Sequence, residues 1–327
     1  MGDRSIKSLF RIDDNAGPQK IGFLLLNQFS MIAFASAVEP LRAANRQANK
    51  ALFEWVVVSA EGQSSTASNG MLIQTNTCIE ALKECCIVFV CAGVRVRENT
   101  NKAILNLIRR LDRNGAVIGA ICTGTYVMAA AGLLDDRRCT IHWEHIDGLS
   151  EEFPNLDITN DLFEIDGNRV TCAGAMAAFD LTRQMIQSHL GNAIALDVDA
   201  MLMHDEGLGM KDARRPNSGH NPVQRAIAEM HKNIERPLPL SDIAQLATCP
   251  LKTLSRRFQA SLGTSPGQVY RHIRLTEARQ LIESTSLSIS EIALRCGYES
   301  PTALSRAFRL RFGVAPTALG LHQGAPR

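Results

Sequence analysis

Residues 289–316 of this 327-residue chain have the sequence ISEIALRCGYESPTALSRAFRLRFGVAP, and this stretch decides the fold of the C-terminal third. Most of its landmark residues already occur about fifty positions earlier. The offset is 49 residues before the central turn and 50 after it, so one copy has one extra residue in its turn. Each copy has the pattern of a helix, a short turn and a second helix, which predicts two helix-turn-helix modules. The matching pairs are Ile243-Ala244 with Ile292-Ala293, Leu254-Ser255-Arg256 with Leu304-Ser305-Arg306, Phe258 with Phe308, Gly263 with Gly313, and Pro266 with Pro316.

Capping residues mark where several of these helices begin. Ser288 and Glu291 form a capping-box pattern for the first helix of copy two, and Ser300-Pro301 supplies an N-cap and a first-turn proline for its second helix. Copy one has Cys249-Pro250 at the equivalent turn, so its second helix is less well capped. Residues 265–284 form one continuous helical pattern, which predicts a rigid connection between the modules.

The second helix of each module presents polar and basic side chains away from its core. Leu254 and Phe258, like Leu304 and Phe308, are four residues apart and are expected to face the core. From Asn217 onward the chain has 14 Lys and Arg against 7 Asp and Glu, a net charge of +7, whereas the rest has a net charge of −5. A basic helical domain indicates an anionic partner, first of all duplex DNA. The candidate DNA-binding residues are Lys252, Ser255, Arg256, Arg257, Thr302, Ser305, Arg306 and Arg309.

The basic side chains have two expected roles. Arg256 and Arg306 can pair guanine edges bidentately, while Lys252, Arg257 and Arg309 suit phosphates better. Two modules on one face of DNA would read major-groove segments about one helical turn, roughly 34 Å, apart. The alternative is a helical packing domain whose arginines form only a solvated face.

Residues 221–319 resemble the AraC/XylS-type DNA-binding domain. The motifs that carry the resemblance are ISEIALRCGY at 289–298, LSRAF at 304–308 and RFGVAP at 311–316. The resemblance implies a transcriptional regulator, in most cases an activator, that binds direct-repeat half-sites, dimerises through its other domain and works with RNA polymerase. Cys249 departs from the usual Ser or Thr before Pro250, which weakens a helix cap in copy one.

The front of the chain alternates between apolar runs of strand length and helical patterns. Continuous runs rich in Val, Ile, Leu and Phe, at 20–26, 53–59, 86–92 and 116–121, are typical of strands buried on both faces. Helical patterns occupy 30–46, 98–113, 122–133 and 176–190, and shorter strands are expected at 139–142, 162–165 and 169–172. The fold class is therefore a flavodoxin-like α/β domain with a mostly parallel sheet, followed by an all-α domain with two helix-turn-helix modules.

The expected domain plan has four parts. Residues 1–19 are polar and form a flexible lead-in, residues 20–206 form the α/β domain that binds an effector and dimerises, and residues 223–320 form the DNA-binding domain. Residues 207–222 are rich in Gly, Pro, Asn and basic residues, which predicts an exposed linker.

Composition and cysteine spacing exclude several classes of protein. Hydrophobic residues make up 45% of the chain, but no apolar run approaches the roughly 18 residues that a membrane helix needs. The N-terminus lacks the apolar stretch of a secretory signal. The nine cysteines are scattered without metal-ligand spacing, which indicates a reduced cytoplasm, no metal site and no cofactor.

One cysteine follows a buried strand directly. Residues 116–130, AVIGAICTGTYVMAA, predict a strand, a tight turn at Cys122 and a helix opened by small residues. A thiol near a helix N-terminus can have a lowered pKa, and ligands of open α/β sheets bind at this edge. The pattern resembles the class I glutamine amidotransferase-like superfamily, including its cysteine peptidase-like and Parkinson-disease-protein-like branches. Thr123 stands where the hydrolytic branch has His, and residues 28–37 lack the first-helix carboxylate of the related branch.

The order of the two domains is similar to the GlxA subgroup of AraC-type regulators. The supporting stretches are FSMI at 29–32, EPLRAAN at 39–45, AGLL at 131–134, TIHW at 140–143 and TCAG at 171–174. The resemblance to this subgroup implies a regulator that senses a small nitrogen-containing metabolite and controls the catabolism of that metabolite. Ala175-Met176 departs from the usual second Gly and small polar residue, which indicates a different ligand if that loop touches the effector. The candidate pocket residues are Gly93, Cys122, Thr123, His142, Trp143, Ala175 and Met176.

One further feature and two alternative functions stay open at this stage. Glu39, Arg42 and Asn45 share one helix face and are either functional or ordinary solvated groups. The leading hypothesis is a homodimeric regulator and not an enzyme. The alternatives are a cysteine-dependent amidase or deglycase that uses Cys122, and a metabolite-binding protein whose tail mediates protein contacts.

Overall fold

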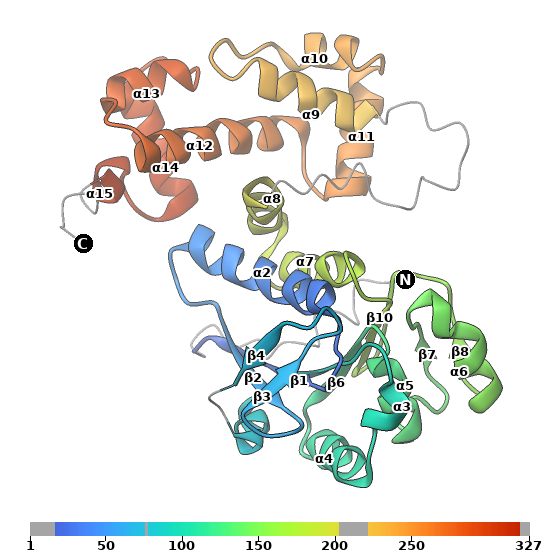
Figure 1. The fold of residues 1–327 in the computed structure, drawn as a ribbon. Helices are drawn as coiled ribbons and strands as arrows, with labels where there is room; N and C mark the ends of the chain where they lie inside the picture. The colour runs from blue at the N-terminus through green and yellow to red at the C-terminus, as the bar shows by residue number, and fades with distance from the viewer. Residues whose placement is uncertain (1–16, 76–77, 203–221, 321–327) are drawn as a thin grey trace. The chain divides into compact units, whose positions relative to one another are not determined.

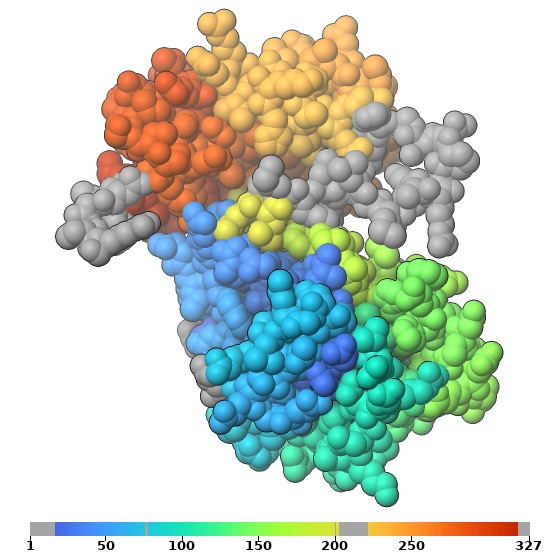
Figure 2. All heavy atoms as spheres, in the orientation of Figure 1, coloured from blue at the N-terminus to red at the C-terminus, as the bar shows by residue number. Residues whose placement is uncertain are grey.

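The computed structural model describes residues 17–75, 78–202 and 222–320, and the chain divides into two compact units, 1–198 and 199–327. In the space-filling view the front unit runs from blue to yellow-green and the C-terminal unit from yellow to red (Figure 2). The predicted lead-in lies outside the described residues up to residue 16, and the predicted linker lies outside them except for Pro222.

The front unit contains a six-stranded sheet in the order β2-β1-β5-β6-β10-β9. Its first five strands in this order are parallel to one another, and β9 is antiparallel to β10. The mostly parallel sheet that the sequence predicts is therefore confirmed. The strands are β1 Gln19–Leu25, β2 Phe53–Ser59, β5 Ile87–Cys91, β6 Val117–Ile121, β9 Phe163–Asp166 and β10 Arg169–Cys172.

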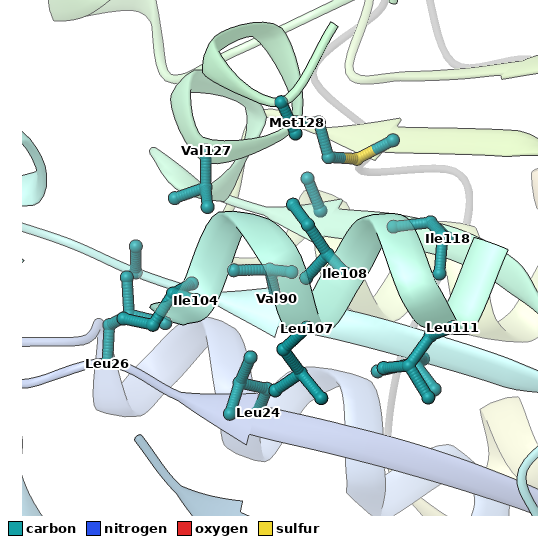
Figure 3. Close-up of a cluster of buried hydrophobic side chains, with 14 of the residues drawn as sticks. Leu24, Leu26, Val90, Ile104, Leu107, Ile108, Leu111, Ile118, Val127 and Met128 are labelled. Carbon is teal, nitrogen blue, oxygen red and sulfur yellow. The ribbon is translucent and has the colours of Figure 1, made fainter. Parts of the chain in front are cut away.

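Helices cover both faces of this sheet, which is why its central strands are apolar throughout (Figure 1). On one face, α2 (Met31–Ala48) packs against α7 (Ala177–Leu190), and Phe34 of α2 meets Phe23 of β1 edge-on at 5.6 Å between ring centroids. On the other face lie α4 (Lys102–Arg113) and α5 (Gly124–Ala130). The buried residues of α4 repeat at i, i+3, i+4 and i+7 and pack on Leu24, Leu26 and Val90 of the sheet (Figure 3).

Several local predictions differ from the structure. The helix expected at 98–113 is two helices, α3 (Val96–Asn99) and α4, because the Asn101 side chain accepts hydrogen bonds from the amides of Ala103 and Ile104 and starts a new helix. The helix after Cys122 ends at Ala130 instead of 133. The strand expected at 139–142 is only β7 (Arg138–Cys139), which pairs with β8 (Asp157–Ile158) outside the main sheet.

A short hairpin and several short helices have no clear signal in the sequence. The hairpin consists of β3 (Ser64–Thr66) and β4 (Leu72–Gln74). The remaining elements of the front part are η1 (Ile79–Glu84), η2 (Trp143–His145), α6 (Ile146–Glu152) and α8 (Asn192–Met201).

The C-terminal unit contains helices and no strand in its described residues, and it repeats as the sequence predicts. The first helices of the two modules are α10 (Leu240–Leu246) and α13 (Ile289–Arg295), and the second helices are α11 (Leu251–Leu262) and α14 (Pro301–Phe312). The first helices, α10 and α13, start 49 residues apart, whereas the second helices, α11 and α14, start 50 residues apart. The extra residue therefore lies in the turn of copy two. The other helices are α9 (Pro222–Lys232), the connecting α12 (Pro266–Ser284) and α15 (Pro316–Gly320).

The predicted helix caps are present in this unit. Ser288 and Glu291 form the capping box of α13, and Ser300 caps α14 ahead of its first-turn proline. In copy one, α11 begins at Leu251, and its N-cap residue Pro250 supplies no side-chain hydrogen bond. A further capping box at the start of α12 joins Ser265 with Gln268.

The repeat also extends into the helix that precedes each module. Arg225 of α9 donates two hydrogen bonds to the carbonyl of Ala247, at 3.1 and 2.8 Å. Arg274 occupies the equivalent position in α12 and donates to the carbonyl of Cys296, the counterpart of Ala247, at 2.8 Å. Each arginine therefore donates to a backbone carbonyl at the carboxyl end of the first helix of its module, where carbonyls lack a partner within the helix. The residue after each carbonyl, Thr248 or Gly297, has a left-handed backbone with φ of +52° or +68°.

Candidate DNA-binding surface and effector site

The second helix of each module buries an apolar stripe and exposes the predicted DNA-binding residues. Leu254 and Phe258 of α11 are fully buried, as are Leu304 and Phe308 of α14. The opposite sides of these helices expose Lys252, Arg256, Arg257, Thr302, Arg306 and Arg309, with Ser255 and Ser305 half-buried between them. The two Ser-Arg pairs occupy the same place in each module.

The five cations predicted to bind DNA are free for a partner within the described part of the chain. None of Lys252, Arg256, Arg257, Arg306 and Arg309 forms an ion pair there, whereas Arg279 of the connecting helix pairs with Glu283 at 2.7 Å. On α14 a shallow hollow is lined by Thr302, Ser305, Arg306, Arg309 and Leu310. Unpaired cations on one helix face suit an anionic backbone and base edges in a groove.

The carboxyl edge of the front sheet has an unusual backbone. After β1, β5, β6 and β10, the chain turns through a non-glycine residue with positive φ: Gln28 at +64°, Arg95 at +57°, Cys122 at +60° and Ala175 at +48°. Such conformations cost roughly 1 to 3 kcal/mol each and gather at functional sites. All four lie along the edge at which other open α/β sheets bind their ligands.

Cys122 lies in the middle of this edge and is 7% exposed. Burial raises the pKa of its thiol to about 11; a hydrogen bond from the Thr123 backbone lowers the pKa, and the nearby Glu144 carboxylate raises it. The sequence indicated that a helix N-terminus could lower this pKa, but burial outweighs that effect. A neutral thiol is a weak nucleophile, so this cysteine is suited to packing rather than to attack.

Thr123 and Gly93 fix the turn beside Cys122. The Thr123 hydroxyl is buried and donates a hydrogen bond of 2.6 Å to the carbonyl of Gly93. A Cβ on Gly93 would lie 2.2 Å from the carbonyl oxygen of Gln28, so only glycine fits. The Thr123 side chain thus holds two strand ends together.

The other predicted pocket residues lie in two segments, one next to Glu144, whose carboxylate acts on the Cys122 thiol, and one next to Gly174. The Nδ1 atom of His142 lies 3.7 Å from the Oε2 atom of Glu144. The ring centroid of His142 is 5.9 Å from that of Trp143, which is 72% exposed. In the other segment the exposed Ala175 and Met176 follow Gly174, whose backbone packs against Cys122. The Met176 sulfur accepts a hydrogen bond from Ser36 of α2 at 3.7 Å.

The structure gives Glu39, Arg42 and Asn45 mainly local contacts. Glu39 and Arg42 form an ion pair of 2.6 Å on the surface of α2. The Asn45 side chain donates to the carbonyl of Phe53 and accepts from the amides of Leu52 and Phe53, so it ties α2 to the start of β2.

Residues 17–75, 78–202 and 222–320 contain no cluster of three or more His, Cys, Asp or Glu placed to hold a metal ion. No helix within the same ranges is long and apolar enough to cross a membrane. All nine cysteines are free thiols. A cleft of about 660 Å³ that the sequence did not predict lies between the end of β2 and η1, lined by Ser59, Ala60, Gly62, Gln63, Gln74, Thr75, Cys78 and Ile79.

Comparison with known proteins now decides the family. Residues 19–188 match the DJ-1/PfpI family, and residues 243–320 match a helix-turn-helix domain. The HTH-type transcriptional regulator GlxA of Rhizobium meliloti is 37% identical over 95% of this chain and 98% of its own length. The chain belongs to the AraC family of transcriptional regulators. It combines a DJ-1/PfpI-type front domain with an AraC-type DNA-binding domain, as the sequence motifs indicated.

Other relatives of this AraC-family regulator agree. The HTH-type transcriptional regulator CdhR of Pseudomonas aeruginosa is 39% identical over 91% of this chain and 90% of its own length. The crystal structure of an AraC family transcriptional regulator from Pseudomonas putida superposes with a TM-score of 0.52 at 29% identity, covering 57% of this chain and all of the other. Because the relatives are regulators, the chain is a regulator and not an enzyme, and the amidase or deglycase alternative is wrong.

Proposed function

We propose that this AraC-family regulator activates a catabolic operon in response to a small nitrogen-containing metabolite. In this proposal it binds a direct-repeat promoter site as a homodimer in the cytoplasm and acts together with RNA polymerase. The observation that carries the proposal is the pair of equivalent Ser-Arg sites with exposed arginines, Ser255-Arg256 and Ser305-Arg306, on helices joined through one continuous helix.

The DNA contacts follow from the chemistry of these side chains. Arg256 and Arg306 pair with guanines in successive major-groove segments, because a guanidinium matches the O6 and N7 acceptors of guanine. Lys252, Arg257 and Arg309 bind phosphates and set the register of each helix. The exposed position of all five cations, without ion pairs in the described residues, supports these roles.

The effector site is at the carboxyl edge of the front sheet, around Cys122. The four left-handed turns and the exposed Trp143 and Met176 support this placement. The neutral Cys122 thiol packs against the effector, and the aromatic face of Trp143 suits a cationic nitrogen group. The nine free cysteines support a reduced compartment.

The DNA part of the proposal is tested with sites selected from a pool of random duplex DNA by the purified full chain. Binding to the selected duplex is followed by fluorescence anisotropy from 50 to 300 mM salt. We expect affinity to fall steeply and linearly on a double logarithmic scale, because each neutralised phosphate releases counterions. Failure to select any sequence, or binding that does not respond to salt, would refute the proposed DNA contacts.

The effector part is tested separately by thermal-shift screening of amino acids and methylated amines. A ligand present at 100 times its dissociation constant stabilises the domain that binds it by roughly 2.7 kcal/mol. We expect a positive hit to lose most of its shift in the Trp143→Ala variant but to keep it in the Arg306→Ala variant. An equal shift in both variants would contradict the placement of the effector site.

A further inference from the structure

The hollow on α14 defines which positions of a second helix can face a DNA groove. Its lining side chains are separated by three, one, three and one residues, so they form one continuous helix face. At 1.5 Å per residue this face is roughly 12 Å long, which matches three to four base-pair steps of about 3.4 Å. The lining residues are Thr302, Ser305, Arg306, Arg309 and Leu310.

The repeat assigns the same face to α11, because the second helices start 50 residues apart. Burial agrees position by position: the serine is half-buried in both helices, and the other four side chains are exposed in both. Each module therefore presents five equivalent positions, which we call its reading face. The reading face of α11 consists of Lys252, Ser255, Arg256, Gln259 and Ala260.

Only the centre of the reading face is the same in both modules. Serine and arginine occupy the second and third positions of each, so we expect both DNA segments to share the guanine that the arginine reads. At the first position Lys252 is replaced by Thr302, and at the fourth position Gln259 is replaced by Arg309. Each reading face thus has a flanking cation at one end and a neutral polar side chain at the other, and the two ends are exchanged between the modules.

The neutral side chains Gln259 and Thr302 can distinguish bases, whereas a cation bound to a phosphate cannot. Both are exposed, and neither side chain forms a hydrogen bond within the part of the chain that the structure describes. A glutamine amide matches the N6 and N7 atoms of adenine, and a threonine methyl group makes apolar contact with the C5 methyl group of thymine. Leu310, which is 87% exposed, adds apolar surface to the hollow that Thr302 borders.

We propose that Gln259 and Thr302 are further specificity-determining residues. Gln259 reads an adenine in the DNA segment of the first module, and Thr302 packs its methyl group against a thymine in the segment of the second module. This inference rests on the proposed function, in which Lys252 and Arg309 bind phosphates. It makes the site an imperfect direct repeat, because the two segments share their centre and differ in the base read beside it.

The first test gives α14 the reading face of α11. Sites are selected from random duplex DNA by the full-length wild type and by the variant Thr302→Lys/Arg309→Gln/Leu310→Ala, whose three changes are all at exposed positions. We expect the wild type to select two blocks with a common centre and different flanking bases, and the variant to select two identical blocks. Identical blocks in the wild type, or an unchanged second block in the variant, would overturn the inference while leaving the DNA-binding function intact. Failure to select any sequence would overturn both.

The second test isolates Gln259. Gln259→Ala should lower affinity for the selected duplex at least fivefold and remove the adenine preference at one position of the first block. Gln280→Ala changes an exposed glutamine of the connecting helix and should leave affinity and base preference unchanged. An equal loss of affinity for Gln259→Ala on selected and on random DNA would mean that Gln259 contacts a phosphate, and would overturn its role.

The third test isolates the methyl group of Thr302. The thymine of the second block is replaced by deoxyuridine, which lacks only the C5 methyl group, and affinity is measured by fluorescence anisotropy. We expect the wild type to bind the uracil duplex about fourfold more weakly, the effect of one buried methyl group. Thr302→Ser keeps the hydroxyl and loses only the methyl group, so it should bind both duplexes equally well. The same thymine preference in the wild type and in Thr302→Ser would overturn the role of Thr302.

Discussion

Gly174 packs so closely against the Cys122 turn that a single methyl group there should perturb the turn. An alanine Cβ at Gly174 would lie 2.8 Å from Cys122 Cβ, 3.1 Å from its Cα and 3.2 Å from its Sγ. Carbon atoms in ordinary contact are about 3.5 to 4.0 Å apart, so the chain has to shift. Gly174 also has φ of +93°, which disfavours any side chain.

The cost of Gly174→Ala has two parts that can be separated. The left-handed backbone contributes roughly 1 to 2 kcal/mol, and overpacking adds roughly 1 to 3 kcal/mol. Gly191→Ala is a matched control, because Gly191 has φ of +86° but no atom within 4 Å of a Cβ. We therefore expect Gly174→Ala to lower the free energy of unfolding by about 1 to 3 kcal/mol more than Gly191→Ala.

Differential scanning calorimetry of the full chain measures this difference in the transition of the front domain. A difference of 1 to 3 kcal/mol corresponds to about 2 to 12 °C for a domain of this size. The double variant Gly174→Ala/Cys122→Gly removes the Cβ and Sγ contacts and should recover most of the part of the loss that is due to overpacking. Equal destabilisation by Gly174→Ala and Gly191→Ala would refute the claim that Cys122 and Gly174 are packed as a unit.

Three further predictions concern the thiol, the core and the two functional surfaces. Burial raises the pKa of Cys122 to about 11, so about one thousandth of this thiol is thiolate at pH 8. Iodoacetamide should therefore modify the exposed Cys78 first, and labelling of Cys122 should rise as the pH increases. Faster labelling of Cys122 than of Cys78 in a mass-spectrometric time course would contradict this prediction. Phe308→Ala leaves a cavity in the core of the second module and should cost roughly 3 to 5 kcal/mol in chemical denaturation, and a loss below about 1 kcal/mol would contradict its burial. In a promoter–reporter assay, Cys122→Ala should weaken effector binding by on the order of 1 kcal/mol and so raise the inducer concentration for half-maximal response about fivefold. Arg306→Ala should abolish the response at every inducer concentration. Complete loss in folded, DNA-bound Cys122→Ala at saturating inducer would argue for covalent chemistry.

The secondary structure that the sequence predicts best is buried on both faces or repeated. The strand at residues 53–59 has the predicted bounds, and the other three long strands are each shorter or shifted by one or two residues. These strands were predictable because continuous apolar runs of this length are typical of strands buried on both faces. The helices of the repeat could be predicted as well, because the two copies of the sequence pattern are expected to fold into the same helix-turn-helix geometry. The Arg225 and Arg274 bonds were not predicted, although these two arginines are related by the same offset as the first helices of the modules.

The elements that the sequence did not predict are short, or depend on tertiary contacts. The hairpin of β3 and β4 has three residues in each strand and little burial, so it has no periodic signal. The order of the strands in the sheet cannot be derived from periodicity either. The pKa of Cys122 is a tertiary property, because it depends on how completely the neighbouring turns cover the thiol. The turn itself was predictable, since a buried strand runs directly into Cys-Thr-Gly.

The central claim is that two equivalent helices of one chain read two successive DNA segments. The most direct measurement is selection from random duplex DNA by the wild type, Arg256→Ala and Arg306→Ala, followed by footprinting on the selected sites. We predict that the wild type selects two conserved blocks about one helical turn apart, and that each variant loses base preference in a different block, at a cost of roughly 1 to 3 kcal/mol. A single block in the wild-type selection, or loss of the same block in both variants, would contradict the account.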